Sequence, residues 1–417
     1  MLLFLLLFIV AAFCAPLIMR FGRLGFLALA AVPAAAFCYL LTFAGDVLAG
    51  NFHRESFPWV PELGFIIDVR LDHLSWVMGL IVSGVGALVL VYCSRYFSAS
   101  AQGINRFAAV FVAFSGAMLG LVTTDNTLAL YLFWELTTIF SFLLIGHSSD
   151  RAASRRAALQ AIIVTTSGGL AMLGGIIILG QIPGGSYSIS ELITAAKTGT
   201  LGVAPILAQS TSQTVLTAAV VLILFGALSK SALIPFHFWL PAAMAAPTPV
   251  SAYLHAAAMV KAGVYLVARF APGFSGYAAW HYIILGFGLY TMLLGGYRAL
   301  RQNDLKLVLA FGTVSQLGLL MVLVGYDTKA TMLAGLTLLI AHALFKSTLF
   351  LAVGFIDWAT GTRDLRMLSG MGRKMPSLAV FTTIAAASMM GLPPLAGFVA
   401  KEAALHALID GEGLDQL

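Results

Sequence analysis

The chain has 417 residues, of which 60% are hydrophobic and only 10% are charged. Apolar runs of about 20 residues recur along nearly its whole length, which predicts an all-α polytopic membrane protein and leaves no stretch for a soluble domain. The net charge of +6 comes from basic residues in short loops between these runs. The positive-inside rule explains that pattern better than a nucleic-acid-binding patch, so we expect the lipid bilayer and no nucleic acid among the partners.

The apolar runs predict about twelve transmembrane helices. We expect them at residues 2–19, 25–45, 73–94, 107–123, 126–147, 156–180, 214–240, 243–270, 279–299, 306–325, 330–357 and 377–409. The first run has no lysine or arginine before it, whereas Arg20 and Arg23 follow it. This order favours a retained first helix over a cleaved signal peptide and predicts that the N-terminus lies outside the cell.

Basic residues are unevenly divided between alternate loops. One set of loops carries fourteen lysines and arginines, and the other set carries five. The richer set is therefore expected on the cytoplasmic face of the inner or plasma membrane, which makes the proposed span count consistent with the charge pattern.

Prolines interrupt two of the expected helices. Pro235 lies in the seventh, and Pro393 and Pro394 lie in the twelfth beside Gly391 and Gly397. A proline removes a backbone donor, and carbonyls freed at membrane depth need protein or water as partners. Two broken helices indicate inverted repeats around a central ion site, with ordinary proline kinks as the alternative.

Four lysines fall inside long apolar segments: Lys230, Lys261, Lys346 and Lys401. A lone charge at the centre of a bilayer costs from ~3 to more than ~10 kcal/mol, so such a residue indicates function. Together with Glu135 and several histidines, these lysines indicate a path for protons or ions. A structural scaffold without conduction would gain nothing from groups so costly to bury.

Glu135 has no other acidic residue within ten positions on either side. A buried carboxylate becomes neutral unless a cation lies close to it, and Lys230 in the neighbouring broken helix is the expected partner. Changing the distance between the two groups would change their proton affinities, which is a means of loading and releasing a proton. The alternative is a static buried ion pair.

Three histidines share spans with these lysines. His342 and Lys346 are four residues apart and are expected on one helix face, where the imidazole can pass a proton along. His255 and Lys261, six residues apart, are expected on different sides of one helix, extending the path laterally. His237 follows Pro235 closely. A single histidine of this kind is more often a satisfied core residue, but three on spans that also hold lysines favour a proton relay.

Lys306, at the start of the tenth span, is a further candidate, with a cytoplasmic anchor as the alternative. No ATP site is indicated, because Lys230 lacks a glycine-rich loop. The sequence also lacks HExxH, CxxC and the paired spacing of a bundle metal site, so we expect no cofactor and no resident metal.

Four stretches carry a resemblance to a known superfamily. They are KSALIPFHFWLPAAMAAPTPVSAYLHAAAMVKAGVYLVARF (230–270), DLKLVLAFGTVSQLG (304–318), AHALFKSTLFL (341–351) and GLPPLAGFVAKE (391–402). They resemble the antiporter-like proton-pumping subunits of respiratory complex I and of Mrp-type multisubunit Na⁺/H⁺ antiporters. His237 and Lys261 make the chain look most like the large A subunits of the Mrp type.

The resemblance implies three regions: helices one to three (1–105), a first antiporter repeat of helices four to eight (106–270), and a second, incomplete repeat of helices nine to twelve (271–417). It implies that Glu135 and Lys230 are a coupled pair. Lys261, His255, His342 and Lys346 would form the central axis, and Lys401 would end the second half-channel.

The expected function is therefore that of one subunit of a secondary Na⁺/H⁺ antiporter, not an enzyme, with other membrane subunits as partners and protons and Na⁺ as substrates. The alternative is a proton-pumping subunit of a redox-driven complex I or membrane-bound hydrogenase. Because the sequence stops at GLDQL before a second repeat could close, we expect a fragment, or a remainder in a separate chain, and no transport by this chain alone.

Overall fold

The computed structural model describes residues 1–98, 101–202 and 209–409, and the side chains of 209–212 stay outside that description. Within these residues, ten helices are long and apolar enough to cross a membrane. They are α1 (Leu2–Ile18), α2 (Arg23–Thr42), α4 (His73–Tyr96), α5 (Ile104–Thr123), α6 (Thr127–Ile145), α7 (Ala152–Gln181), α9 (Gln209–Lys230), α13 (Ala278–Leu300), α14 (Leu305–Gly325) and α15 (Lys329–Thr360).

Two of the expected spans are pairs of shorter helices. The eighth consists of α11 (Thr248–Leu254) and α12 (Lys261–Phe274), and the twelfth consists of α17 (Pro376–Met390) and α18 (Ala396–Ile409). Ten of the twelve expected spans thus contain one membrane-length helix each, and the seventh and twelfth are interrupted as predicted, whereas the break in the eighth is a correction. The remaining helices are short: α3 (Ala44–Leu48), α8 (Ile189–Lys197), α10 (Trp239–Ala242), α16 (Met371–Lys374) and 3₁₀ turns at Met19–Phe21, Pro61–Leu63, Phe236–Phe238, Ala243–Ala245 and Leu365–Met367.

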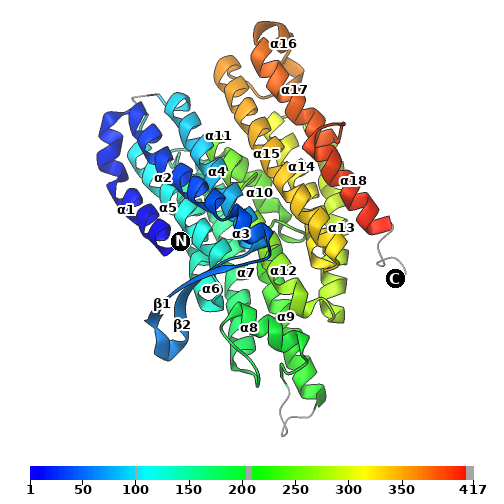
Figure 1. Ribbon diagram of the computed structural model, residues 1–417. Coiled ribbons are helices and arrows are strands. Elements are labelled where there is room, and N and C mark those ends of the chain that lie inside the picture. Colours follow the sequence, from blue (N-terminus) through cyan, green and yellow to red (C-terminus); the bar gives the residue numbers. More distant parts are fainter. Residues whose placement is uncertain (99–100, 203–208, 410–417) are drawn as a thin grey trace.

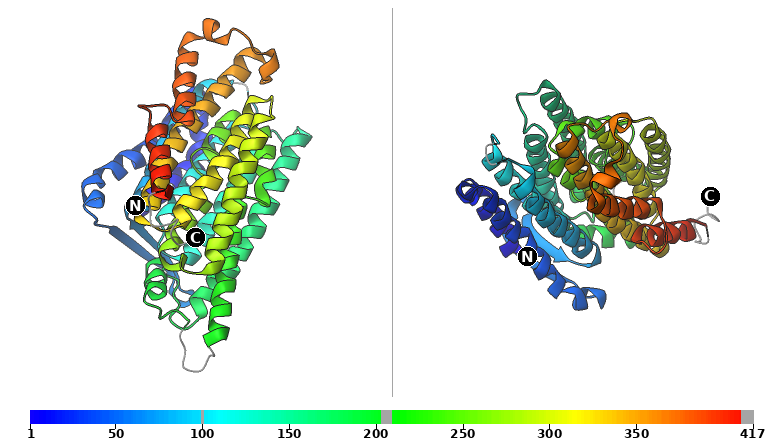
Figure 2. Two further views of the ribbon diagram at one scale, coloured as in Figure 1. Left: turned by 90° about the vertical axis from the view of Figure 1, so that its right-hand side faces the viewer. Right: turned by 90° about the horizontal axis from the view of Figure 1, so that it is seen from above.

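The helices run side by side as one bundle, with the β-hairpin and α8 at one end and α16 at the other (Figure 1). Seen from above, the first helices and the last helix lie on opposite sides of this bundle (Figure 2). Large apolar side chains such as Phe13, Leu88 and Leu293 are well exposed on its outside. An exposed apolar surface on membrane-length helices is the surface that lipid tails would cover.

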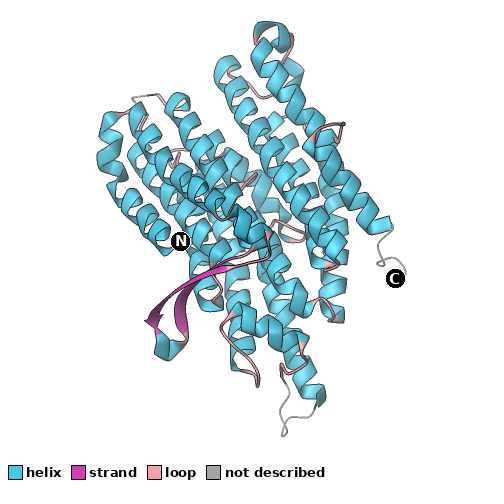
Figure 3. Cartoon of the chain, in the orientation of Figure 1, coloured by secondary structure: helices cyan, strands magenta, loops and turns pink. Residues whose placement is uncertain are grey.

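The all-α prediction is corrected by a β-hairpin. Strands β1 (His53–Val60) and β2 (Phe65–Leu71) pair antiparallel in a stretch for which the sequence predicts no regular element (Figure 3). The turn between them ends at Gly64, whose φ of 70° is readily adopted by glycine. The Arg54 guanidinium donates to Asp68 at 3.0 Å, which joins the two strands by their side chains.

Side chains cap the starts of several helices. Asp72 caps α4 and forms a capping box with Ser75, while Asn126 caps α6 by accepting from two backbone N–H groups. Asp72 also accepts from Arg269 of α12 at 3.0 Å. Burial alone would raise the pKa of Asp72, but Arg269 and the hydrogen bonds from Ser75 together outweigh it and hold that pKa at about 2. The pair therefore stays charged and joins α12 to the start of α4.

Candidate functional site

Lys230 is the last residue of α9, and its side chain is fully buried. Its ammonium donates to the carbonyl of Trp134 at 2.7 Å and to the hydroxyls of Thr137 and Thr138 at 2.7 and 2.8 Å. It also lies 4.7 Å from the centre of the Trp134 ring, within cation–π range. One turn of α6 therefore holds this ammonium with uncharged groups alone.

Glu135 follows Trp134 on the same helix but does not form an ion pair with Lys230 in the described residues. Its Oε1 is buried without a hydrogen-bond partner and lies against α7, where a Cβ on Gly169 would come within 2.0 Å of it. The two charges still interact through space. The alternative of a static buried ion pair is therefore wrong for the described structure, and the role of Glu135 and Lys230 as a coupled pair stays a prediction.

Thr137 and Thr138 escape prediction from the sequence. Threonines are common in membrane helices, and nothing in their spacing shows that a lysine 92 residues away reaches them. The one available signal is that they lie two and three positions after the isolated Glu135.

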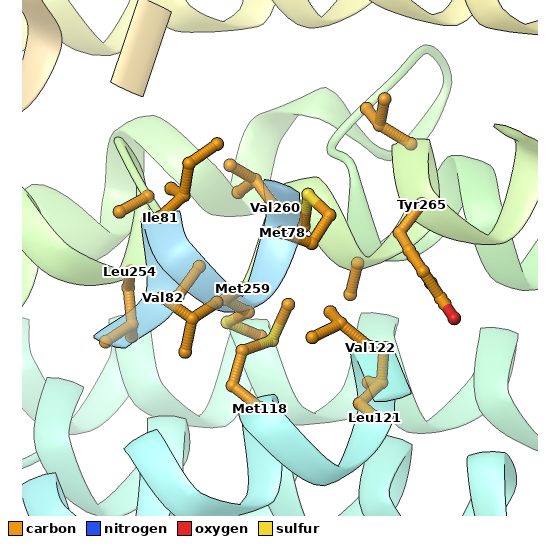
Figure 4. Packing of buried hydrophobic residues seen from close by; sticks show 14 of the residues in the cluster. Met78, Ile81, Val82, Met118, Leu121, Val122, Leu254, Met259, Val260 and Tyr265 are labelled. Atoms are coloured by element: carbon orange, nitrogen blue, oxygen red, sulfur yellow. The ribbon is translucent and has the colours of Figure 1, made fainter. Parts of the chain in front are cut away.

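The helix is interrupted between α11 and α12, at residues 255–260, although this stretch contains no proline. His255 caps the end of α11, and Lys261 is the first residue of α12, so the expectation of a single helix carrying both is wrong. Ser231 donates to the carbonyl of Val260 at 2.7 Å, which ties this break to the end of α9. Apolar residues of α4 and α5, among them Met78 and Met118, pack against the break (Figure 4).

Lys261 and Lys346 lie on either side of His342. The Lys261 ammonium donates to the carbonyl of Leu339 on α15 at 3.0 Å, and that of Lys346 donates to the carbonyl of Leu309 on α14 at 3.1 Å. His342 and Lys346 share α15, as expected, and both are fully buried. His342 interacts electrostatically with both lysines, so the three groups are neighbours inside the bundle.

Lys306 is only 2% exposed and donates to the carbonyl of Ala246 at 3.0 Å. A surface anchor would hold its ammonium in the headgroup layer, so that alternative is wrong. His237 is partly exposed, and neither ring nitrogen has a partner within the described structure.

Lys401 is partly exposed rather than buried, which corrects the expectation of four buried lysines. It lies on α18 at the side of the bundle and donates to the carbonyls of Met389 and Met390 at 2.7 and 3.1 Å. These carbonyls lie at the end of α17. The helix is interrupted there, around Pro393 and Pro394, as predicted. The role of Lys401 in a second half-channel stays a prediction.

Several buried polar atoms without a partner belong to these residues or to the helices that carry them. In the described part of the chain they include Glu135 Oε1, Thr248 Oγ1, Ser251 Oγ and both ring nitrogens of His255 and His342. Buried polar groups are nearly always hydrogen-bonded, to protein or to ordered water. A row of such atoms beside ammonium groups is therefore suited to hold water and to pass protons.

Fold and site together define a multi-pass membrane protein with a row of ammonium, carboxylate and imidazole groups inside its helix bundle. The chain belongs to the family described as "NADH:quinone oxidoreductase/Mrp antiporter, TM", whose profile matches residues 124–414. Residues 59–108 match a second family, "NADH-Ubiquinone oxidoreductase (complex I), chain 5 N-terminus".

The chain is similar to the A subunits of antiporters. It is 42% identical over 392 residues to the Na⁺/H⁺ antiporter A subunit of Alkalihalophilus pseudofirmus, covering 91% of this chain and 47% of that protein. It is 44% identical over 371 residues to a probable K⁺/H⁺ antiporter A/B subunit of Rhizobium meliloti, covering 88% and 36%. The chain thus spans about half or less of the length of these relatives.

A solved structure, the Mrp complex from Dietzia sp. DQ12-45-1b, contains a chain that superposes with a TM-score of 0.89 at 38% identity, covering 98% of this chain and 43% of that one. A membrane-bound sulfane sulfur reductase superposes with a TM-score of 0.83 at 22% identity, which shows the same fold.

Proposed function

We propose that this chain is the part of an Mrp-type A subunit that conducts protons in a secondary cation/proton antiporter, and that it acts only together with other membrane subunits. The relatives named above are antiporter A subunits, and a similar chain stands in an Mrp complex. The names of these relatives differ in the cation, Na⁺ or K⁺, and we propose Na⁺ with K⁺ as the alternative.

One observation carries the proposal. Lys230, Lys261 and Lys346 are fully buried, and their ammonium groups bind carbonyl and hydroxyl oxygens but no carboxylate in the described residues. A buried ammonium without a fixed counter-ion responds to any charge that moves near it. A proton arriving at Glu135 therefore changes the electrostatic environment of Lys230 without breaking a salt bridge.

The path runs from Glu135 and Lys230, past His255 and the helix break, to Lys261, His342 and Lys346. His237 stands at the seventh-helix interruption and Lys306 at the end of the bundle that bears the richer set of basic loops. That end faces the cytoplasm in this proposal, which leaves the N-terminus and the β-hairpin outside the cell. The three-part division at 105 and 270 belongs to the same proposal.

A ranking of variants tests the path. Lys261→Ala and Lys346→Ala should lower cation-dependent proton flux by about 100-fold, because water cannot replace a titratable cation. His255→Ala, His342→Ala and His237→Ala should each cause a smaller loss, because water can bridge a missing imidazole. The measurement is flux in vesicles that contain the assembled complex, and dead histidine variants beside active lysine variants would overturn the path.

A second interpretation, a redox-driven proton pump, shares the fold and the buried lysines. The identity to antiporter A subunits favours antiport. Purification of the complex separates the two interpretations: the antiporter should contain small membrane subunits without flavin or iron–sulfur proteins.

A further inference from the structure

Two consecutive glycines of α7, Gly168 and Gly169, lie against the helices that carry Lys230 and Glu135. A Cβ built on Gly169 would overlap the Oε1 atom of Glu135 and lie 3.2 Å from its Cδ. The next atom is Cδ1 of Trp134, at 3.4 Å. The carboxylate carried by α6 therefore occupies the space of the side chain that Gly169 lacks.

Gly168 makes a similar close contact with α9. A Cβ on this residue would overlap the hydroxyl oxygen of Ser229 and lie 2.5 Å from the Cβ of the same serine. It would also lie 3.4 Å from the Cα of Gly226. Ser229 directly precedes Lys230, so neighbouring positions of α7 bear on both members of the coupled pair.

Trp134 lies beside both charged groups. The Lys230 ammonium is 4.7 Å from the centre of its ring, and its Cδ1 lies beside the point that Glu135 Oε1 occupies. The indole N–H and Glu135 Oε1 are both buried without a hydrogen-bond partner in the described structure. A donor and an acceptor in that state beside one glycine are suited to hold a water molecule between them. The carboxylate can thus be hydrated without leaving α7.

We propose that Gly169 is a positioning residue for Glu135: because it has no side chain, the carboxylate rests on α7, out of direct contact with Lys230. This inference rests on the proposed function, since it concerns the geometry of the coupled pair. A direct ion pair would favour the charged form of both groups and so hold the proton in place. At a larger distance each group still senses the charge of the other but can gain or lose a proton.

Gly169→Ala should move the carboxylate rather than the helices. The atoms that the new Cβ would crowd most closely belong to the far end of one flexible side chain, which can change its rotamer. At Gly168, by contrast, the crowded atoms include the Cβ of Ser229 and the backbone of α9. The Gly169 variant is therefore expected to assemble with its carboxylate displaced.

The first test is proton flux in fully assembled Gly169→Ala complex. We expect cation-dependent flux to fall by about tenfold, because a misplaced reacting group transfers its proton more slowly. Gly174→Ala on the same helix is the matched control, since the atom nearest to its Cβ position is Leu222 Cδ1 at 3.7 Å. The control should keep wild-type flux. Wild-type flux in the assembled Gly169 variant would overturn the proposal.

A double-variant cycle separates positioning of Glu135 from packing of α7. Glu135→Asp shortens the side chain by one methylene group and withdraws the carboxylate from Gly169. Adding Gly169→Ala to that variant should then cause no further loss of flux. An equal loss in both backgrounds would show that Gly169 only packs the helix, and the proposal would be wrong.

The thermal unfolding temperature of the purified complex gives a readout that needs no flux. Alanine favours a helix over glycine, so Gly169→Ala should raise this temperature in Glu135→Ala complex, where the crowding side chain is gone. With Glu135 present, that gain should be lost. Equal changes in both backgrounds, or failure to assemble in both, would contradict the proposal. The proposed function fails separately, if Lys261→Ala and Lys346→Ala leave antiport intact.

Discussion

Lys230 shows how this chain holds a buried charge. Its three acceptor oxygens come from one turn of α6, the helix that carries Glu135. Because these oxygens are neutral, the ammonium keeps its contacts whether Glu135 is charged or protonated. Coupling between the two groups therefore acts through space and needs no movement of the lysine.

Lys230→Arg tests whether this residue releases a proton. A guanidinium hardly deprotonates in proteins, so the variant keeps the charge but loses the ability to pass a proton on. We expect cation-dependent proton flux to fall by about 100-fold in assembled complex. Lys329→Arg, at an exposed lysine that begins α15, is the control and should be silent. Normal flux in the Lys230 variant would make this residue a fixed charge.

Burial of the lysines could be predicted residue by residue, and their partners could not. Apolar flanks place Lys230, Lys261 and Lys346 inside the bundle, because a charge must avoid lipid. Which oxygen meets each ammonium depends on how distant helices pack: Lys261 reaches the carbonyl of Leu339, 78 residues away. The burial predicted for Lys401 is wrong: its flanks are equally apolar, but α18 lies at the side of the bundle (Figure 1), where the side chain is partly exposed.

At the scale of elements, most of the candidate residues lie at or near interrupted helices. The interruptions near Pro235 and Pro393 could be predicted, since a proline cannot continue the hydrogen-bonding pattern. The break at residues 255–260 could not, because HAAAMV favours a helix. At this break, tertiary packing outweighs the local helix propensity. Apolar residues of α4 and α5 pack against it, and the Ser231 hydroxyl donates to the Val260 carbonyl. The hairpin at 53–71 escapes prediction because two prolines and several charges obscure its strands.

Gly263→Ala tests the contact that positions the break. A Cβ at this residue of α12 would lie 2.3 Å from the carbonyl oxygen of Ala227 in α9. It would lie equally close to the hydroxyl of Ser231, directly after that helix. Overpacking of this kind costs about 1–3 kcal/mol, so we expect a lower thermal unfolding temperature of the purified complex. Gly286→Ala on α13 is the control, since nothing lies within 4 Å of its Cβ position. Equal unfolding temperatures for the two variants would contradict the close contact.

At the scale of the whole molecule, the bundle separates two environments. An apolar surface surrounds titratable groups inside the bundle, and the Arg269–Asp72 pair joins α12 to the start of α4 near the hairpin. The twelve apolar runs and the titratable groups inside the bundle could be predicted from composition and spacing. The Arg269–Asp72 pair could not be predicted, because the two residues are 197 positions apart in the chain.

Glu135→Gln tests the central claim, that protons cross through this buried row. The substitution keeps the volume and removes the one carboxylate that α6 carries. Cation-dependent proton flux is measured in vesicles containing fully assembled complex, with assembly verified by subunit composition. The account predicts that antiport is abolished while assembly stays intact. Wild-type flux in assembled Glu135→Gln complex would contradict it.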